Sequence, residues 1–160
     1  MQHISGRRAR AWRLQELTIG QRATITRRVT SREVLLYMGA TGDLNPVYLD
    51  RNYAARTPLG EPVVPAVMLS GYVYALLTQH LPGPGTVTVS QSLHFLHPVR
   101  IGDTLTLSAE VAAKDLARGR ARLRLVARNQ RGQEVLAGEV EVYPPHELRP
   151  VLSDAFEDYD

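Results

Sequence analysis

One apolar segment, residues 66–81, constrains the fold of this chain more than any other feature. Its Val, Met, Leu, Tyr and Ala side chains surround nearly the whole circumference of a helix, so it predicts a helix buried on most sides. The Pro82-Gly83 pair that follows ends this helix. A buried helix requires a second layer of structure to cover it.

Four runs of alternating apolar and polar residues supply that layer. The third is the clearest, with Ala121, Leu123, Leu125 and Ala127 on one face and mainly arginines on the other. Short turns, as at 129–132, predict an antiparallel meander. The expected strands are residues 86–96, 104–113, 120–129 and 133–143, with an earlier strand over 21–29. The sequence therefore predicts an α+β fold, a curved antiparallel sheet wrapped around the central helix.

Two small helices are expected between the first strand and the central helix. Thr30 and Glu33 have the spacing of a capping box, which marks a helix start, and Gly39 and Gly42 end that helix. A short helix over 51–56 precedes a loop rich in Pro and Gly.

The turn over residues 41–50 groups a glycine, two acids, an amide and a proline. Gly42 permits a conformation that other residues avoid, and Pro46 restricts both itself and Asn45. Such a turn holds side chains in one direction, as a site requires. Two interpretations stay open: an ordinary loop in which Asp43 caps backbone amides, or a functional site.

The 160 residues, 44% of them apolar, suffice for one domain with a sizeable core. We expect a basic arm over 1–16, with Trp12 anchoring its end, the folded domain over 17–143, and a Pro-rich, acidic tail over 144–160. The chain has no apolar run of membrane-spanning length, no apolar stretch of a secretory signal and no cysteine. These features favour a cytoplasmic protein.

The net charge of +3 comes almost entirely from scattered arginines, because Lys114 is the only lysine. A nucleic-acid partner would require a denser basic patch with interleaved aromatics, so none is expected, whereas an anionic cofactor such as coenzyme A needs only a few arginines. No close His, Asp and Glu cluster predicts a metal site. His94 and His97 at the second strand are interpreted as surface histidines, and Ser70, Ser90 and Ser92 lack a recognisable base.

Several ordered motifs resemble those of the MaoC-like hydratases, similar to the (R)-specific enoyl-CoA hydratases with a hot-dog fold. The resemblance covers roughly residues 18–142. The motifs are Thr41-Gly42-Asp43-Leu44-Asn45-Pro46, Asp50, Tyr53-Ala54-Ala55, Pro62-Val63-Val64, Leu81-Pro82-Gly83-Pro84-Gly85, Gln91-Ser92-Leu93, Phe95, Pro98-Val99-Arg100-Ile101-Gly102-Asp103 and 129–132.

The resemblance implies a homodimer whose two sheets join, and an acyl thioester bound near the central helix. In the family, an Asp and a His activate the water that adds to a 2-enoyl thioester, a backbone N–H polarises the carbonyl, and no metal or prosthetic group is needed. Asp43 stands at the family Asp, Asn45 also matches, and Tyr48 occupies the His position. Ala66 is the expected oxyanion N–H. Pro65, Val67 and Tyr74 are expected at the substrate, Tyr74 by alignment with a helix serine.

The replacement by Tyr48 leaves three functions open. Tyrosine has an unperturbed pKa of about 10, so at neutral pH it donates hydrogen bonds and is a poor base. The chain is expected to be a hydratase or dehydratase with Asp43 as its principal group and Tyr48 positioning water. Alternatively, it binds an acyl-CoA or acyl carrier without turnover, for instance as a heterodimer subunit. A third function is thioester hydrolysis with Asp43 as base.

Overall fold

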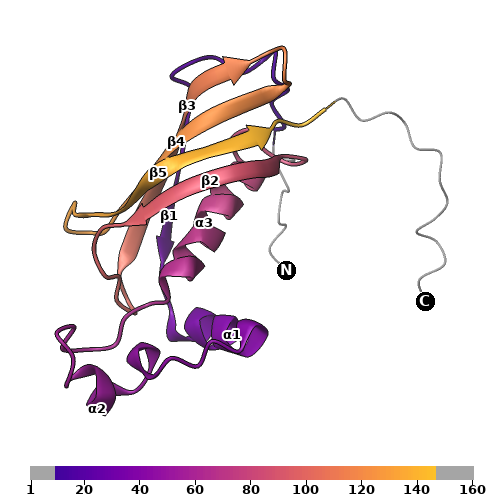
Figure 1. Ribbon diagram of the computed structural model, residues 1–160. Helices are drawn as coiled ribbons and strands as arrows, with labels where there is room; N and C mark the ends of the chain where they lie inside the picture. Colours follow the sequence, from indigo (N-terminus) through magenta and orange to yellow (C-terminus); the bar gives the residue numbers. More distant parts are fainter. Residues whose placement is uncertain (1–9, 147–160) are drawn as a thin grey trace, which may run out of the picture.

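Antiparallel strands form one sheet in the computed structural model, which describes residues 10–146. The order across the sheet is β1-β3-β4-β5-β2 (Figure 1), so β1 and β2 are its edges. The strands are β1 (Arg22–Arg28), β2 (Val87–Phe95), β3 (Thr104–Asp115), β4 (Arg120–Arg128) and β5 (Glu134–Tyr143). Leu123 and Leu125 of β4 are buried while Arg122 and Arg124 point outward, as the alternation predicts. The predicted α+β architecture is confirmed.

Helix α3 (Ala66–Gln79) lies along one face of the curved sheet (Figure 1). Its buried side chains join those of β3, β4 and β5 in a single core. They are Met68, Leu69, Ser70, Tyr72, Val73, Leu76 and Leu77. Val67, however, is 62% exposed, and Ala66 and Gly71 are also exposed. The prediction of burial on most sides is therefore wrong for one face of α3, which lies open beside β2 in the single chain.

Helix α1 (Ser31–Thr41) begins at the predicted capping box and ends at Gly42, whereas Gly39, also expected to end it, lies within the helix. The Thr30 hydroxyl oxygen accepts the Glu33 N–H at 3.3 Å, and the Glu33 carboxylate accepts the Thr30 N–H at 2.8 Å. Gly42 follows in the left-handed conformation, with φ of 72°, and its N–H is donated to the Met38 carbonyl. The chain then forms a 3-10 turn, η1 (Pro46–Tyr48), and a short helix, α2 (Arg51–Ala54). Helices α1 and α2 lie together at one end of the sheet (Figure 1).

Five arginines on strands β1 and β4 form ion pairs. The pairs are Arg22–Glu110, Arg27–Glu33, Arg120–Glu141, Arg122–Glu139 and Arg128–Glu134. Much of the arginine excess is thus matched by carboxylates on the same surface. None of the helices within residues 10–146 is long and apolar enough to cross a membrane.

The segment before β1 packs on the domain. The Trp12 N–H donates to the Pro82 carbonyl at 2.7 Å, the Arg10 guanidinium lies 3.6 Å from the Trp12 ring centre, and Leu14 and Leu17 are buried. Trp12 therefore anchors this segment as expected. Residues 1–9 of the expected arm and 147–160 of the expected tail lie outside the described residues.

Candidate active site

The Asp43 carboxylate is held by two phenols. Tyr37 donates to its Oδ2 at 2.9 Å and Tyr48 donates to the same oxygen at 3.0 Å. All three residues are partly buried. In the described part of the chain, no group donates to Oδ1 of Asp43, so this oxygen is available to a water or a substrate hydroxyl. Charge-assisted hydrogen bonds of this kind fix a carboxylate more firmly than neutral ones.

The side chains of Thr41 and Asn45 bind the backbone groups of the turn. The Asp43 carboxylate therefore makes its hydrogen bonds with the two phenols. The Thr41 hydroxyl accepts the Asp43 N–H at 3.2 Å and donates to the Tyr37 carbonyl at 2.7 Å. The Asn45 side-chain oxygen accepts the Val47 N–H at 3.3 Å and so begins η1. The interpretation of Asp43 as a backbone cap is therefore wrong. Asn45, expected among the catalytic residues, uses its amide oxygen to shape the turn.

Both phenols are held in the protonated form. Burial, and then the hydrogen bond and charge of Asp43, raise the pKa of Tyr48 above the ordinary value for tyrosine. The same two causes, in the same order, raise the pKa of Tyr37. At neutral pH each phenol is accordingly a hydrogen-bond donor to the carboxylate and not a base.

Tyr48 also lines a cavity of about 290 Å³ at the beginning of α3. Most of its wall is apolar, and its polar groups are few. The lining residues are Tyr48, Val63, Val64, Ala66, Leu69, Phe95, Leu96, His97, Pro98 and Val99. Ala66 is the first residue of α3, so its N–H has no partner within the helix, and none elsewhere in residues 10–146. The cavity therefore brings a phenol bound to Asp43 close to an unused backbone donor.

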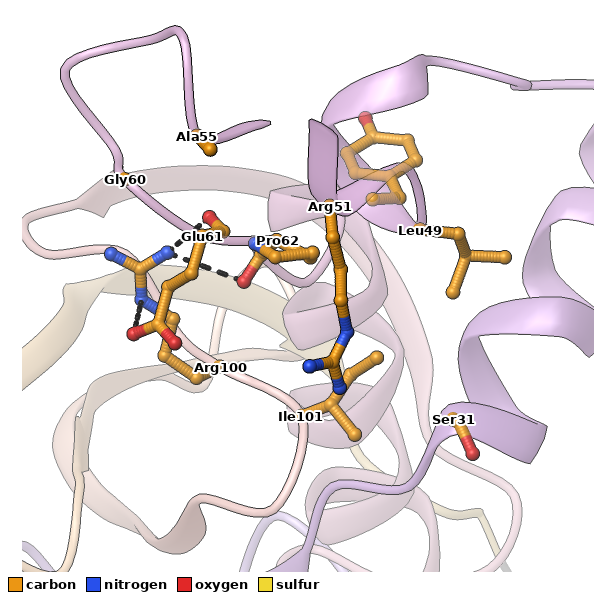
Figure 2. A pocket seen from close by; sticks show the side chains of 10 residues that line it. Ser31, Leu49, Arg51, Ala55, Gly60, Glu61, Pro62, Arg100 and Ile101 are labelled. Atoms are coloured by element: carbon orange, nitrogen blue, oxygen red, sulfur yellow. Dashed lines mark hydrogen bonds and ion pairs between the residues drawn. The ribbon is translucent and has the colours of Figure 1, made fainter. Parts of the chain in front are cut away.

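A second cavity, of about 580 Å³, lies beside Tyr48 and is more polar (Figure 2). Arg100 on its Glu61 side binds the carbonyls of Leu59, Glu61 and Pro62 at 2.5–3.2 Å and also pairs with the Glu61 carboxylate at 3.3 Å. Arg51 lies on the Ile101 side. Within the described residues the Arg51 side chain has no carboxylate partner. One arginine thus fixes the loop, and the other is available to an anion.

Val67 and Tyr74 face a different hollow, a groove of about 640 Å³ between α3 and β2. The Tyr74 hydroxyl donates to Gln91 Oε1 at 2.8 Å and so bridges the groove. Phe95 lines both this groove and the cavity next to Tyr48. Pro65 is buried at the N-cap of α3. Tyr48, which donates to Asp43, therefore lines the same cavity as Ala66, whereas Val67 and Tyr74 line the groove beside β2.

Two residues that were not expected at the site contribute to it. Tyr37 is not among the expected site residues, although its position six residues before Asp43, across the Gly42 turn, is a usable signal. His97, interpreted as a surface histidine, is exposed but lines the cavity with Tyr48 and Ala66. Among the described residues, no group of three or more His, Cys, Asp or Glu side chains is placed to hold a metal.

Comparisons with known proteins extend over most of the chain. A family profile described as "MaoC like domain" matches residues 15–130. A 3-hydroxybutyryl-CoA dehydratase of Methylorubrum extorquens is 39% identical over 132 residues, covering 82% of this chain and 83% of the relative. An (R)-specific enoyl-CoA hydratase of Aeromonas caviae is 38% identical over 99 residues, covering 62% and 74% respectively. The solved structure of the (R)-hydratase from A. caviae involved in PHA biosynthesis has a TM-score of 0.79 and 35% identity, over 82% of this chain and 99% of that one.

Proposed function

This chain belongs to the MaoC-like domain family, and from that premise we propose that it is a hydratase or dehydratase of acyl thioesters. The reaction is the addition of water to a 2-enoyl-CoA, giving a 3-hydroxyacyl-CoA, or its reverse. The related proteins named as a 3-hydroxybutyryl-CoA dehydratase and an (R)-specific enoyl-CoA hydratase support this choice.

The observation that carries the proposal is that Tyr48, which binds Asp43, lines the same cavity as Ala66, whose N–H is free within residues 10–146. Hydration requires a group that takes a proton from water and a donor that stabilises the negative charge developing on the thioester oxygen. Oδ1 of Asp43 is available for the water, and the Ala66 N–H for the oxygen. Tyr48 holds Asp43 at 3.0 Å and closes one wall of the cavity. The surrounding apolar wall suits the acyl chain.

The coenzyme A or phosphopantetheine part of the substrate is proposed to lie in the cavity beside Arg51. Coenzyme A and the phosphopantetheine of a carrier protein both bear phosphate, which a guanidinium binds well. Arg100 holds the loop at 59–62 in place and leaves Arg51 as the available cation. We propose that the chain needs no metal or prosthetic group, because proton transfer and backbone hydrogen bonds suffice for this reaction.

A homodimer is the proposed assembly. β2 is an edge strand with unpaired backbone groups, and such edges in soluble proteins are generally covered. Val67, Val87 and Phe95 are 62%, 59% and 42% exposed beside that edge. Joining β2 to its copy in a second subunit would cover them. A molecular mass equal to one chain at micromolar concentration would contradict this assembly.

A second function, binding of an acyl thioester without turnover, is favoured by one observation. The raised pKa of Tyr48 prevents it from acting as the base that a histidine supplies at neutral pH. A heterodimer with an active partner subunit would then supply the chemistry.

The test is hydration of crotonyl-CoA, followed by loss of the enoyl absorbance. The natural protein should turn over, and Asp43→Asn should lose about a hundredfold to ten-thousandfold in kcat with an unchanged circular dichroism spectrum. Asp115→Asn, which removes an exposed carboxylate paired with Arg118, is the matched control and should leave the rate unchanged.

Tyr48→His separates the two functions. If the natural protein is inactive and Tyr48→His is active, the pocket binds thioesters but has lost the chemistry. Activity that persists in Asp43→Asn would refute the assignment of Asp43.

A further inference from the structure

We propose that His97 donates and accepts the proton at the α-carbon of the substrate. Tyr48 cannot fill this role, because its phenol stays protonated at neutral pH. This inference rests on the proposed hydratase function and names a residue that the family comparison does not supply. It follows from the position of the His97 ring, the hydrogen bond that orients it and the proton balance of the reaction.

The His97 ring is fixed at one nitrogen and free at the other. Its Nδ1 lies 2.7 Å from the carbonyl oxygen of Glu134. A carbonyl only accepts hydrogen bonds, so Nδ1 carries the proton and Nε2 of the neutral ring carries the lone pair. In the described part of the chain no group occupies Nε2. This is the arrangement of a base whose second nitrogen is held by a backbone oxygen.

The backbone around His97 is anchored as well. Leu96 donates its N–H to the Val135 carbonyl at 3.0 Å, and Phe95 pairs with Leu136 in the sheet. The end of β2 is thus tied to the beginning of β5 directly beside the Glu134 contact. A ring that is held by both its backbone and its Nδ1 loses little entropy when a substrate approaches.

His97 faces the cavity in which the reaction is proposed. Tyr48, Ala66 and His97 line the same volume of about 290 Å³, so the ring lies on the wall that also contains the free Ala66 N–H. The titratable groups nearby are Tyr48, Asp43 behind it, and Glu134, whose carboxylate lies 2.5 Å from Arg128. His94 is also exposed on β2 but does not line this cavity.

The proton balance of hydration requires two groups. Oδ1 of Asp43 takes one proton from water while the water oxygen forms a bond to C3 and the double bond shifts its electrons toward the thioester oxygen. The Ala66 N–H binds that oxygen. His97, protonated at Nε2, then gives its proton to C2, and the proton on Asp43 returns through solvent to His97. In dehydration, neutral His97 removes the C2 proton, and Asp43 returns a proton to the departing hydroxide.

His97→Asn tests the proposal because it separates orientation from proton transfer. The Asn amide nitrogen occupies the place of Nδ1 and still donates to the Glu134 carbonyl, but the side chain has no counterpart of Nε2. We expect kcat for crotonyl-CoA hydration to fall about a hundredfold to ten-thousandfold, with KM little changed. His94→Asn on the same strand is the matched control and should keep the natural rate.

A rescue experiment provides an independent readout. Added imidazole should partly restore His97→Ala, which also serves if His97→Asn folds poorly.

The outcomes separate this inference from the proposed function. An active natural protein with an equally active His97→Asn variant would overturn the role of His97 and leave the hydratase assignment intact. A natural protein without turnover on enoyl thioesters would overturn both. Loss of activity in His97→Asn together with rescue of His97→Ala by imidazole would establish the role.

Discussion

The Tyr37 hydroxyl on α1 donates a hydrogen bond of 2.9 Å to Oδ2 of Asp43, across the left-handed turn at Gly42. Tyr48 binds the same oxygen from η1. The carboxylate therefore joins the end of one helix to the beginning of the next element. The direction of the carboxylate is set from both sides, and within residues 10–146 no group donates to Oδ1.

Tyr37→Phe removes one of these two donors and should reduce hydratase activity. Hydrogen bonds to charged groups contribute about 1.5–3 kcal/mol, so the loss in kcat should be roughly tenfold to a hundredfold. Tyr53→Phe is the control, because the Tyr53 ring is 48% exposed. Steady-state kinetics check the prediction, and equal rates for the two variants would show that Tyr48 alone orients Asp43.

Ala66→Pro removes the proposed oxyanion donor while sparing the helix. Proline is well tolerated at the first position of a helix, and the preceding Pro65 already has an extended backbone, with ψ of 123°. We expect an unchanged thermal midpoint and a loss of about a hundredfold to a thousandfold in kcat. Ala66→Ser, which keeps the N–H, should retain activity. A fully active, folded Ala66→Pro would exclude this N–H from the reaction.

Tyr72 should make the protein sensitive to alkaline pH. Burial, and then the charge of Glu33, raise the pKa of Tyr72 to about 12. An unfolded tyrosine has a pKa of about 10, so the stabilisation is complete below pH 10 and is lost as pH rises toward 12. Urea unfolding at several pH values should show this fall, and Tyr72→Phe should flatten it.

Tyr72→Phe should not destabilise the fold at neutral pH. The Tyr72 hydroxyl is buried and makes no hydrogen bond of normal geometry within residues 10–146, although Glu33 and Arg27 lie near it. Removing an unpaired buried polar group is neutral or stabilising. A marked drop in the melting temperature of Tyr72→Phe at pH 7 would indicate a hydrogen bond to this hydroxyl in solution.

Leu76→Asp should prevent soluble expression. Leu76 has no exposed surface and lies at the centre of the core between α3 and the sheet. An unpaired carboxylate there would cost several kcal/mol, a large share of the stability of a domain of this size. Expression of Leu76→Met is the control, because that change conserves volume. A soluble, cooperatively folded Leu76→Asp would refute the central position of this side chain.

Local patterns predicted much of the fold. The capping box at Thr30 and Glu33 and the alternation through β4 depend on residues close in sequence, so both were correct. The open face of α3 was not predicted, because its exposed and buried residues are equally apolar. Composition alone does not say which side of such a helix the sheet covers.

The candidate site was predicted only in part. The motif and the resemblance proposed roles for Asp43, Tyr48 and Ala66, and these roles stay predictions. The partners of Asp43 and of Arg100 depend on how the chain folds back. Arg100, for example, binds carbonyls about 40 residues earlier, which no local pattern encodes. His97 enters the cavity because β2 ends beside β5, a long-range pairing that one sequence does not specify.

The strand order β1-β3-β4-β5-β2 also sets an expected sequence of folding events. β3, β4 and β5 are joined by short turns, so they pair with little loop-closure entropy and should form first. β1 and β2 must close long loops, since Arg22 pairs with Glu110. Asp43, Tyr48 and Ala66 lie in the chain between these two late edges, and His97 follows the end of β2. Pulse-labelled hydrogen exchange should therefore find β4 amides protected before those of β2, and the cavity should be the last part of the molecule to assemble.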